Sequence, residues 1–122
     1  MKVLFVSSGN SHYGIVPFIK SQGESLINEG IELDYFQIKR KGLYGYLSNI
    51  IPLVKQLKKN RYDIIHAHYG LIGLLCVLTF TRIPIVLSIM GDDVYGSFNK
   101  KGNHNFKRVH YKNMIFQTYY LK

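Results

Sequence analysis

The sequence predicts an α/β fold in which helices cover both faces of a parallel β-sheet. Short apolar runs that are rich in β-branched residues alternate four times with helical patterns, at spacings that suit helical crossovers between parallel strands. The chain has 122 residues, of which 47% are hydrophobic and 14% aromatic, enough for a sizeable core. We therefore expect one doubly wound domain over residues 1–122.

The first half of the chain contains strand, helix and strand. Residues 2–7 form a β-branched and aromatic run that ends in Ser-Gly-Asn-Ser, as a buried strand followed by a turn would. Residues 14–29 carry apolar side chains at helical spacing, and the sequence Asn28-Glu29-Gly30 is a stop signal at their C-terminal end. Apolar and polar residues alternate in the first half of residues 31–38, which predicts a strand nearer a sheet edge. The apolar positions of the helix are Val16, Ile19, Leu26 and Ile27.

The second half opens with the basic loop 39–42 and an amphipathic helix, for which we expect a kink at Pro52. Residues 63–66 and 85–89 are short apolar runs and are predicted as central strands, with residues 71–80 as a buried helix between them. The apolar face of the amphipathic helix is predicted to comprise Leu47, Ile50, Ile51, Val54 and Leu57.

Charge and cysteine content restrict the partners and the compartment. Sixteen Lys and Arg against seven Asp and Glu give a net charge of +9, which attracts phosphates, nucleic acid or anionic lipid without choosing among them. The single cysteine, Cys76, lies in an apolar run, so no internal disulfide forms and we expect a buried side chain and a cytoplasmic location. Residues 71–80 are too few for a membrane-spanning helix.

Ligands of parallel α/β sheets bind beyond the carboxyl ends of the strands, which makes the loops 8–14, 66–70 and 90–93 the candidate site. The first loop reads Gly-Asn-Ser-His-Tyr-Gly, but Ile15 and Val16 stand where a P-loop requires Lys and Ser or Thr. Its backbone amides either hold a phosphate or sugar, or form a tight turn and nothing more.

His66 and His68 are two residues apart at a strand end, so they are expected to face one side. No third metal ligand is evident, and the two interpretations of His68, pocket lining and structural support, stay open. Asp92 and Asp93 follow Gly91; we expect one of them to cap the next helix and the other to accept hydrogen bonds from a substrate hydroxyl, and capping alone is the alternative.

The ordered set of these segments resembles the N-terminal domain of family 4 glycosyltransferases, which have the GT-B fold. The segments that carry the resemblance cover residues 1–95: K-V-L-F-V-S-S-G-N, a helix ending N-E-G, D-I-I-H-A-H-Y-G and P-I-V-L-S-I-M-G-D-D. The resemblance implies a Rossmann-like sheet that forms the acceptor-binding half of the enzyme. It also implies a second, donor-binding domain that these 122 residues lack, so that we expect them to be inactive alone.

The resemblance further implies sugar transfer from a nucleotide sugar to a hydroxyl acceptor, usually with retention and with neither a metal nor another cofactor. Gly9 and Asn10 match the turn near the donor. The residues implied to bind substrate are Tyr13, His68, Gly91 and Asp93, with Asp93 also catalytic. The family motif commonly reads His-Gly-x-Asp, whereas this chain has Met90 in place of the histidine.

Members of the family often use lipid-linked acceptors in cell-surface polysaccharide synthesis. The basic loop 39–41 and the following helix, with its tyrosines and lysines, suit contact with anionic lipid at the inner face of the cell membrane. An ordinary solvated helix face is the alternative. The residues concerned are Tyr44, Tyr46, Lys55, Lys58, Lys59 and Arg61.

Two further functions compete with a single-chain enzyme. In the first, the chain is a separate subunit that recruits a donor-binding partner chain. In the second, a non-enzymatic module binds nucleic acid or lipid through its basic C-terminal segment, where Tyr111, Tyr119 and Tyr120 would stack on bases. We expect nucleic-acid binding least.

Overall fold

Four parallel strands form the centre of the domain, in the order β2-β1-β3-β4. The computed structural model describes residues 1–12 and 14–89. The strands are β1 (Lys2–Ser8), β2 (Glu32–Ile38), β3 (Ile64–His68) and β4 (Ile85–Ser88). The predicted parallel sheet is therefore confirmed. Of the two strands expected at its centre, β3 is central, whereas β4 has β3 as its one neighbour among the described strands.

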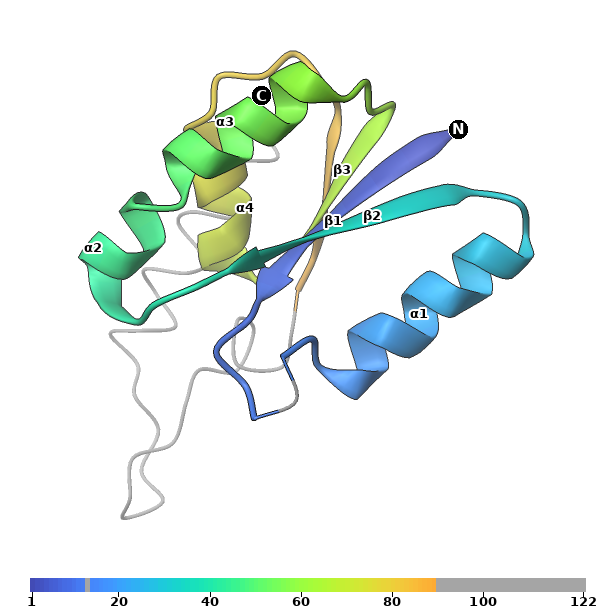
Figure 1. The fold of residues 1–122 in the computed structure, drawn as a ribbon, viewed down its shortest axis with the longest axis horizontal. Helices are drawn as coiled ribbons and strands as arrows, with labels where there is room; N and C mark the ends of the chain where they lie inside the picture. Colours follow the sequence, from blue (N-terminus) through green and yellow to red (C-terminus); the bar gives the residue numbers. More distant parts are fainter. Residues whose placement is uncertain (13, 90–122) are drawn as a thin grey trace.

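Helices cover both faces of the sheet (Figure 1). Helix α1 (Pro17–Asn28) lies on one side, and α3 (Ile50–Lys59) and α4 (Gly70–Val77) lie on the other. The short helix α2 (Gly42–Leu47) precedes α3. No helix among the described residues is long and apolar enough to cross a bilayer.

Successive side chains of β1 point to opposite faces of the sheet, and the core is therefore divided into two clusters. Val3 and Phe5 pack with Ile19 of α1, whereas Leu4 and Val6 point to the opposite face. The larger cluster on that face is built from side chains of β2, α3, β3 and α4 as well. Its other buried members are Ile38, Leu53, Tyr62, Ile65, Ala67, Ile72, Leu75 and Cys76.

The expected kink at Pro52 is wrong. The chain breaks earlier, at Ser48 and Asn49, and Pro52 lies in the first turn of α3. Proline is tolerated there because backbone N–H groups in the first turn have no partner within the helix. Asn49 holds the break, since its side-chain Nδ2 donates to the carbonyls of Lys39 (2.8 Å) and Gly45 (2.6 Å).

The buried face of α3 also differs from the predicted one. Leu53 is fully buried, whereas Ile51 is 67% exposed. On α1, Ile19 is buried as predicted, but Ile27 is exposed, and Val16, which was also predicted on the apolar face, is exposed and precedes the helix. Cys76 is buried, as predicted, and burial raises the pKa of its thiol to about 12.

Candidate functional site

The carboxyl ends of the strands lie at one edge of the sheet because all four strands are parallel. The chain runs from β1 outward to β2 and then returns past β1 to β3, so the gap between β1 and β3 is the topological switch point, where such sheets bind ligands. Gly9 follows β1, and His68 ends β3. The loops that begin at Gly9 and His68 therefore start side by side, as the sequence predicts.

The loop after β1 is fixed by packing and by hydrogen bonds to β2 and its following loop. A Cβ at Gly9 would lie 2.9 Å from the Cβ of Gln37, so a close approach to β2 requires glycine at this position. The Gly9 N–H donates to the carbonyl of Ile38 at 2.9 Å. Asn10 Nδ2 donates to the carbonyl of Arg40, also at 2.9 Å, and thereby ties the loop after β1 to the basic loop after β2.

His66 and His68 face the same side of the sheet, as predicted, and their rings stack with centroids 4.2 Å apart. Both rings meet Phe5 edge-on, at 4.8 and 4.7 Å. His66 Nε2 and Ser88 Oγ are 2.7 Å apart and form a hydrogen bond. His68 is 1% exposed, and neither of its ring nitrogens has a hydrogen-bond partner among the described residues.

These surroundings favour neutral imidazoles. Burial lowers the pKa of His66, and burial together with the neighbouring His66 lowers the pKa of His68 to about 4. At neutral pH each ring therefore carries one N–H donor and one acceptor nitrogen. His66 is the hydrogen-bonded member of the pair, whereas the ring nitrogens of His68 have no hydrogen-bond partner among the described residues.

Two serines extend the polar character of this face. Ser7 pairs in register with Gln37, and Ser88 pairs with His68, so that on this face a polar residue lies at or next to the carboxyl end of each strand. Ser7 is fully buried, and its Oγ has no hydrogen-bond partner within the described part of the chain. The sequence analysis did not identify Ser7 and Ser88 as part of this polar face. A hydroxyl at the end of an otherwise apolar strand is the signal that would have found them.

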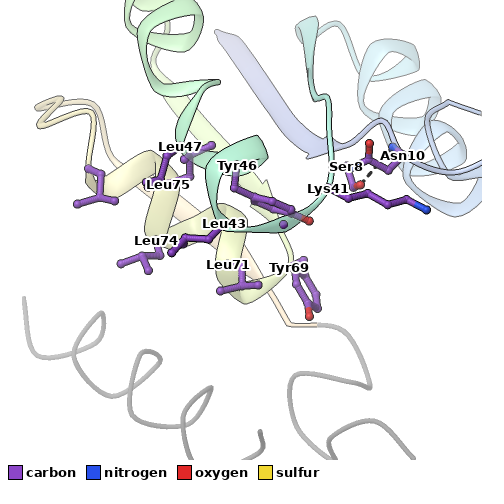
Figure 2. A pocket seen from close by; sticks show the side chains of 12 residues that line it. Ser8, Asn10, Lys41, Leu43, Tyr46, Leu47, Tyr69, Leu71, Leu74 and Leu75 are labelled. Atoms are coloured by element: carbon purple, nitrogen blue, oxygen red, sulfur yellow. Dashed lines mark hydrogen bonds between the residues drawn. The ribbon is translucent and has the colours of Figure 1, made fainter. Parts of the chain in front are cut away.

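A groove opens on the opposite face, between α2 and α4 (Figure 2). Its volume is about 460 Å³, within the range of small-molecule sites. The polar lining residues include Asn10 and Lys41, and one end of the groove thus reaches the loops that follow β1 and β2. The lining residues are Ser8, Asn10, Lys41, Gly42, Leu43, Tyr46, Leu47, Tyr69, Leu71, Leu74, Leu75 and Leu78.

Tyr69 lies between His68 and α4, and its backbone has a conformation that residues other than glycine rarely adopt. Its φ of 93° and ψ of 140° lie in a region favoured by glycine, and such residues cost on the order of 1–3 kcal/mol. The carbonyl of Tyr69 accepts hydrogen bonds from Ile72 and Gly73 (3.1 and 3.0 Å), and its N–H donates to Ser88 (3.0 Å). The side chain lies at the groove (Figure 2).

The sequence of residues 2–119 matches the family model described as glycosyl transferase 4-like. The chain belongs to the glycosyl transferase 4-like family. A search of curated proteins found no match. The match covers nearly the whole chain and agrees with the Rossmann-like arrangement of the parallel sheet.

In this glycosyl transferase 4-like domain, several predicted site residues lie outside the described part of the structure. They are Tyr13, Met90, Gly91, Asp92 and Asp93, and the tyrosines proposed to stack on bases, Tyr111, Tyr119 and Tyr120. The structure brings Gly9, Asn10 and His68 to one edge of the sheet, although the His68 ring is buried beneath that edge. Among residues 1–12 and 14–89, no three His, Cys, Asp or Glu side chains are placed to hold a metal ion.

Proposed function

We propose that this chain forms the acceptor-binding half of an enzyme that transfers a sugar from a nucleotide sugar to a hydroxyl acceptor. The bond between the anomeric carbon and the nucleotide diphosphate breaks, and a bond from that carbon to the acceptor oxygen forms. The nucleotide diphosphate departs with the electron pair of the broken bond, and the proton of the acceptor hydroxyl is transferred to it. The observation that carries the proposal is the polar edge of the sheet at the switch point between β1 and β3, in a chain of this family.

The residues at that edge take different roles in the proposal. Gly9 and Asn10 face the donor, where loop backbone and the nearby Lys41 favour its negative charge. Asp93 is the catalytic residue and accepts a hydrogen bond from a reacting hydroxyl, while Tyr13 and Gly91 contact the acceptor. The ring nitrogens of His68, which lack partners among the described residues, support a role in holding substrate.

A second Rossmann-like domain supplies most of the donor site, either in the same polypeptide or in a partner chain. The domain itself contacts an anionic membrane surface, where lipid-linked acceptors of polysaccharide synthesis reside. This part of the proposal is supported by apolar side chains exposed beside the basic loop: Leu43 is 73% exposed and Tyr44 is 89% exposed. Lys39, Arg40 and Lys41 precede them and are exposed as well.

Release of nucleotide diphosphate tests the enzymatic part. The full-length protein, with its donor-binding domain or partner chain, is incubated with a panel of uridine, guanosine and adenosine diphosphate sugars and a membrane extract as acceptor source. We expect acceptor-dependent release with one donor, and Asp93→Asn should lower kcat by about a hundredfold. Lys20→Gln, an exposed change on α1, should leave kcat unchanged. Absence of release with every donor would refute the proposal.

Liposome co-sedimentation tests the membrane contact. We expect binding to phosphatidylcholine vesicles that contain phosphatidylglycerol and little binding to phosphatidylcholine alone. Arg40→Gln should weaken binding about fivefold, because each basic residue near an anionic surface contributes about 1 kcal/mol. Lys20→Gln is the matched control. Equal sedimentation with both vesicle types would remove the membrane from the proposal.

A further inference from the structure

We infer that the outer edge of β2 binds an extended, basic segment of a partner protein as an added β-strand. The inference goes beyond the proposed function, because it concerns an edge of the sheet at which we place neither donor nor acceptor. Three features of this edge support it: backbone groups that point outward, a strand without the residues that block added strands, and a concentration of acidic side chains.

Alternate residues of β2 direct their backbone groups away from the rest of the sheet. The N–H of Glu32 donates to the carbonyl of Met1, just before β1, at 3.1 Å, so Glu32 points towards β1. Successive residues of a strand alternate in this respect, and the N–H and C=O groups of Leu33, Tyr35 and Gln37 therefore point outward. β2 has β1 as its one neighbour among the described strands, and in Figure 1 no helix crosses in front of β2.

The edge is closed at one end and open along the strand. Asn49 exchanges two hydrogen bonds with the backbone of Lys39, since its Oδ1 accepts from the N–H (3.2 Å) and its Nδ2 donates to the carbonyl (2.8 Å). An antiparallel neighbouring strand would make the same pair of bonds. Proline, lysine or a bulge commonly protects an edge strand, but residues 32–38 contain neither proline nor lysine and pair with β1 in continuous register.

Acidic side chains gather at this edge of a basic protein. The chain carries a net charge of +9, yet four of the five Asp and Glu in residues 1–89 belong to β2 or to α1 and its C-cap. Helix α1 packs against β2. The local charge therefore favours a basic segment and disfavours an acidic one. The four residues are Glu24, Glu29, Glu32 and Asp34.

The two faces of β2 favour different side chains of the added strand. Glu32 and Asp34 lie on the α3 face, where Lys or Arg side chains directly opposite them would form cross-strand ion pairs. Leu33 and Tyr35 lie on the α1 face, in the apolar cluster around Phe5, where apolar side chains would pack. The partner segment should therefore alternate basic and apolar residues, as Lys-Val-Lys-Val does.

Affinity for short synthetic peptides tests the inference. The full-length protein is titrated calorimetrically with acetyl-Lys-Val-Lys-Val-Lys-Val-Lys-amide and with the same peptide in which glutamate replaces lysine. We expect the lysine peptide to bind about tenfold more tightly, through several cross-strand pairs. The net charge of the domain attracts the glutamate peptide, so this order reports the local charge of the edge. Equal affinities or the reverse order would overturn the inference.

Amide hydrogen exchange locates the added strand. In the free protein the outward amides of Leu33, Tyr35 and Gln37 should exchange quickly, whereas that of Asp34, which points towards β1, should be protected. Saturation with the lysine peptide should slow exchange of the three outward amides at least about tenfold and leave Asp34 unchanged. Peptide binding without a change at the three amides would show that the peptide binds elsewhere, and would overturn the inference.

Backbone methylation distinguishes a β-ladder from attraction between charges alone. Methyl groups on the amide nitrogens of the valines block one edge of the lysine peptide, and methyl groups on those of the lysines block the other. Only one edge of the peptide can pair with β2, so we expect the affinities of the two methylated peptides to differ by about tenfold. Equal affinities would contradict strand addition.

Two variants and one control test the edge itself. Leu33→Pro removes one outward N–H at a position where an edge strand tolerates proline, and should weaken lysine-peptide binding about tenfold. Glu32→Gln removes one negative charge and should weaken it about fivefold, even if Leu33→Pro fails to fold. Ser21→Lys, an exposed change on α1, alters the net charge equally and should bind like the parent. Equal weakening by Ser21→Lys and Glu32→Gln would refute the role of the edge.

Sedimentation velocity identifies the other possible occupant of such an edge, a second copy of the chain. We expect the parent and Leu33→Pro to sediment as species of the same size. A parent dimer that Leu33→Pro converts to a monomer would assign the edge to a second copy and overturn the inference.

Discussion

The two faces of the sheet differ in the hydrogen bonding of their buried polar groups. On the α3/α4 face, side chains such as Leu4, Val6 and Ile65 pack in a continuous apolar cluster. Its buried tyrosine, Tyr62, donates to Asp34 Oδ2 at 2.7 Å and accepts from Gln56 at 3.1 Å.

On the α1 face the carboxyl end of the sheet is polar. Ser7 and His68 are buried there, and the Ser7 hydroxyl and both His68 nitrogens have no partner among the described residues. An unpaired buried polar group costs about 1–3 kcal/mol. Packing on the α3/α4 face therefore stabilises the fold. The carboxyl end of the α1 face, where the proposed site lies, retains buried polar groups that lower the free energy of unfolding.

The largest expected effect comes from the apolar face. Ile65→Ala removes a fully buried side chain at the centre of the larger cluster, and the cavity left behind should lower the free energy of unfolding by about 2–5 kcal/mol. Urea denaturation measures the change. Ile51→Ala, at an exposed position of α3, should change the free energy by less than about 0.5 kcal/mol. Similar losses from both variants would show that the described packing is wrong.

The polar face should respond to pH. Because the pKa of His68 falls from 6.5 to about 4 on folding, the unfolded chain binds a proton that the folded chain rejects. His68 should have no effect above pH 6.5, and below it the stability should fall by about 1.4 kcal/mol per pH unit down to about pH 4. His66 acts in the same direction. Urea denaturation at a series of pH values measures this slope.

A matched pair of variants identifies the source of that slope. His68→Gln should reduce the pH dependence, whereas His12→Gln, at an exposed loop position, should leave it unchanged. An unchanged slope in His68→Gln would show that the ring is not held neutral by burial.

Removal of the paired hydroxyl on the apolar face should destabilise the protein. Tyr62→Phe deletes the hydrogen bond to Asp34 and should cost about 1 kcal/mol. The same hydrogen bond, with a smaller contribution from Lys2 at 3.2 Å, lowers the pKa of Asp34, so the Asp34 pKa should rise in the variant. Carbon-detected NMR titration follows that pKa. An unchanged value would contradict the bond.

Removal of the unpaired hydroxyl on the polar face should have the opposite sign. Ser7→Ala removes a buried group that has no partner in the described structure and should raise the free energy of unfolding by about 1 kcal/mol. If the alanine variant is instead less stable than the parent, the Ser7 hydroxyl has a partner and the contrast between the two faces weakens. A double variant with Tyr62→Phe should show additive effects, since the two sites share no partner.

Much of the fold follows from the sequence because strand and helix periods differ. The apolar runs of β1, β3 and β4 and the spacing of the crossovers were enough to predict parallel strands, and a period of two was enough to place His66 and His68 on one face. The family resemblance was confirmed by the match over residues 2–119. The roles of Gly9, Asn10 and His68 stay predictions.

The remainder depends on contacts between segments that are distant in sequence. Helix α2 contains Gly42 and Gly45 in six residues and has little intrinsic helix propensity, and it forms because the chain folds closely on itself. A Cβ at Gly45 would lie 2.9 Å from the backbone of Arg40. The groove between α2 and α4 was missed for the same reason, since no periodic pattern records which helices pack together.

The unusual backbone at Tyr69 has a consequence for timing. The neighbouring hydrogen bonds fix its φ and ψ when the domain folds, before any ligand arrives. The Tyr69 main chain therefore has little conformational freedom left to lose when a ligand binds against the side chain. The entropic cost of ordering the Tyr69 backbone is thus incurred once, at folding, and is not repeated each time a ligand binds.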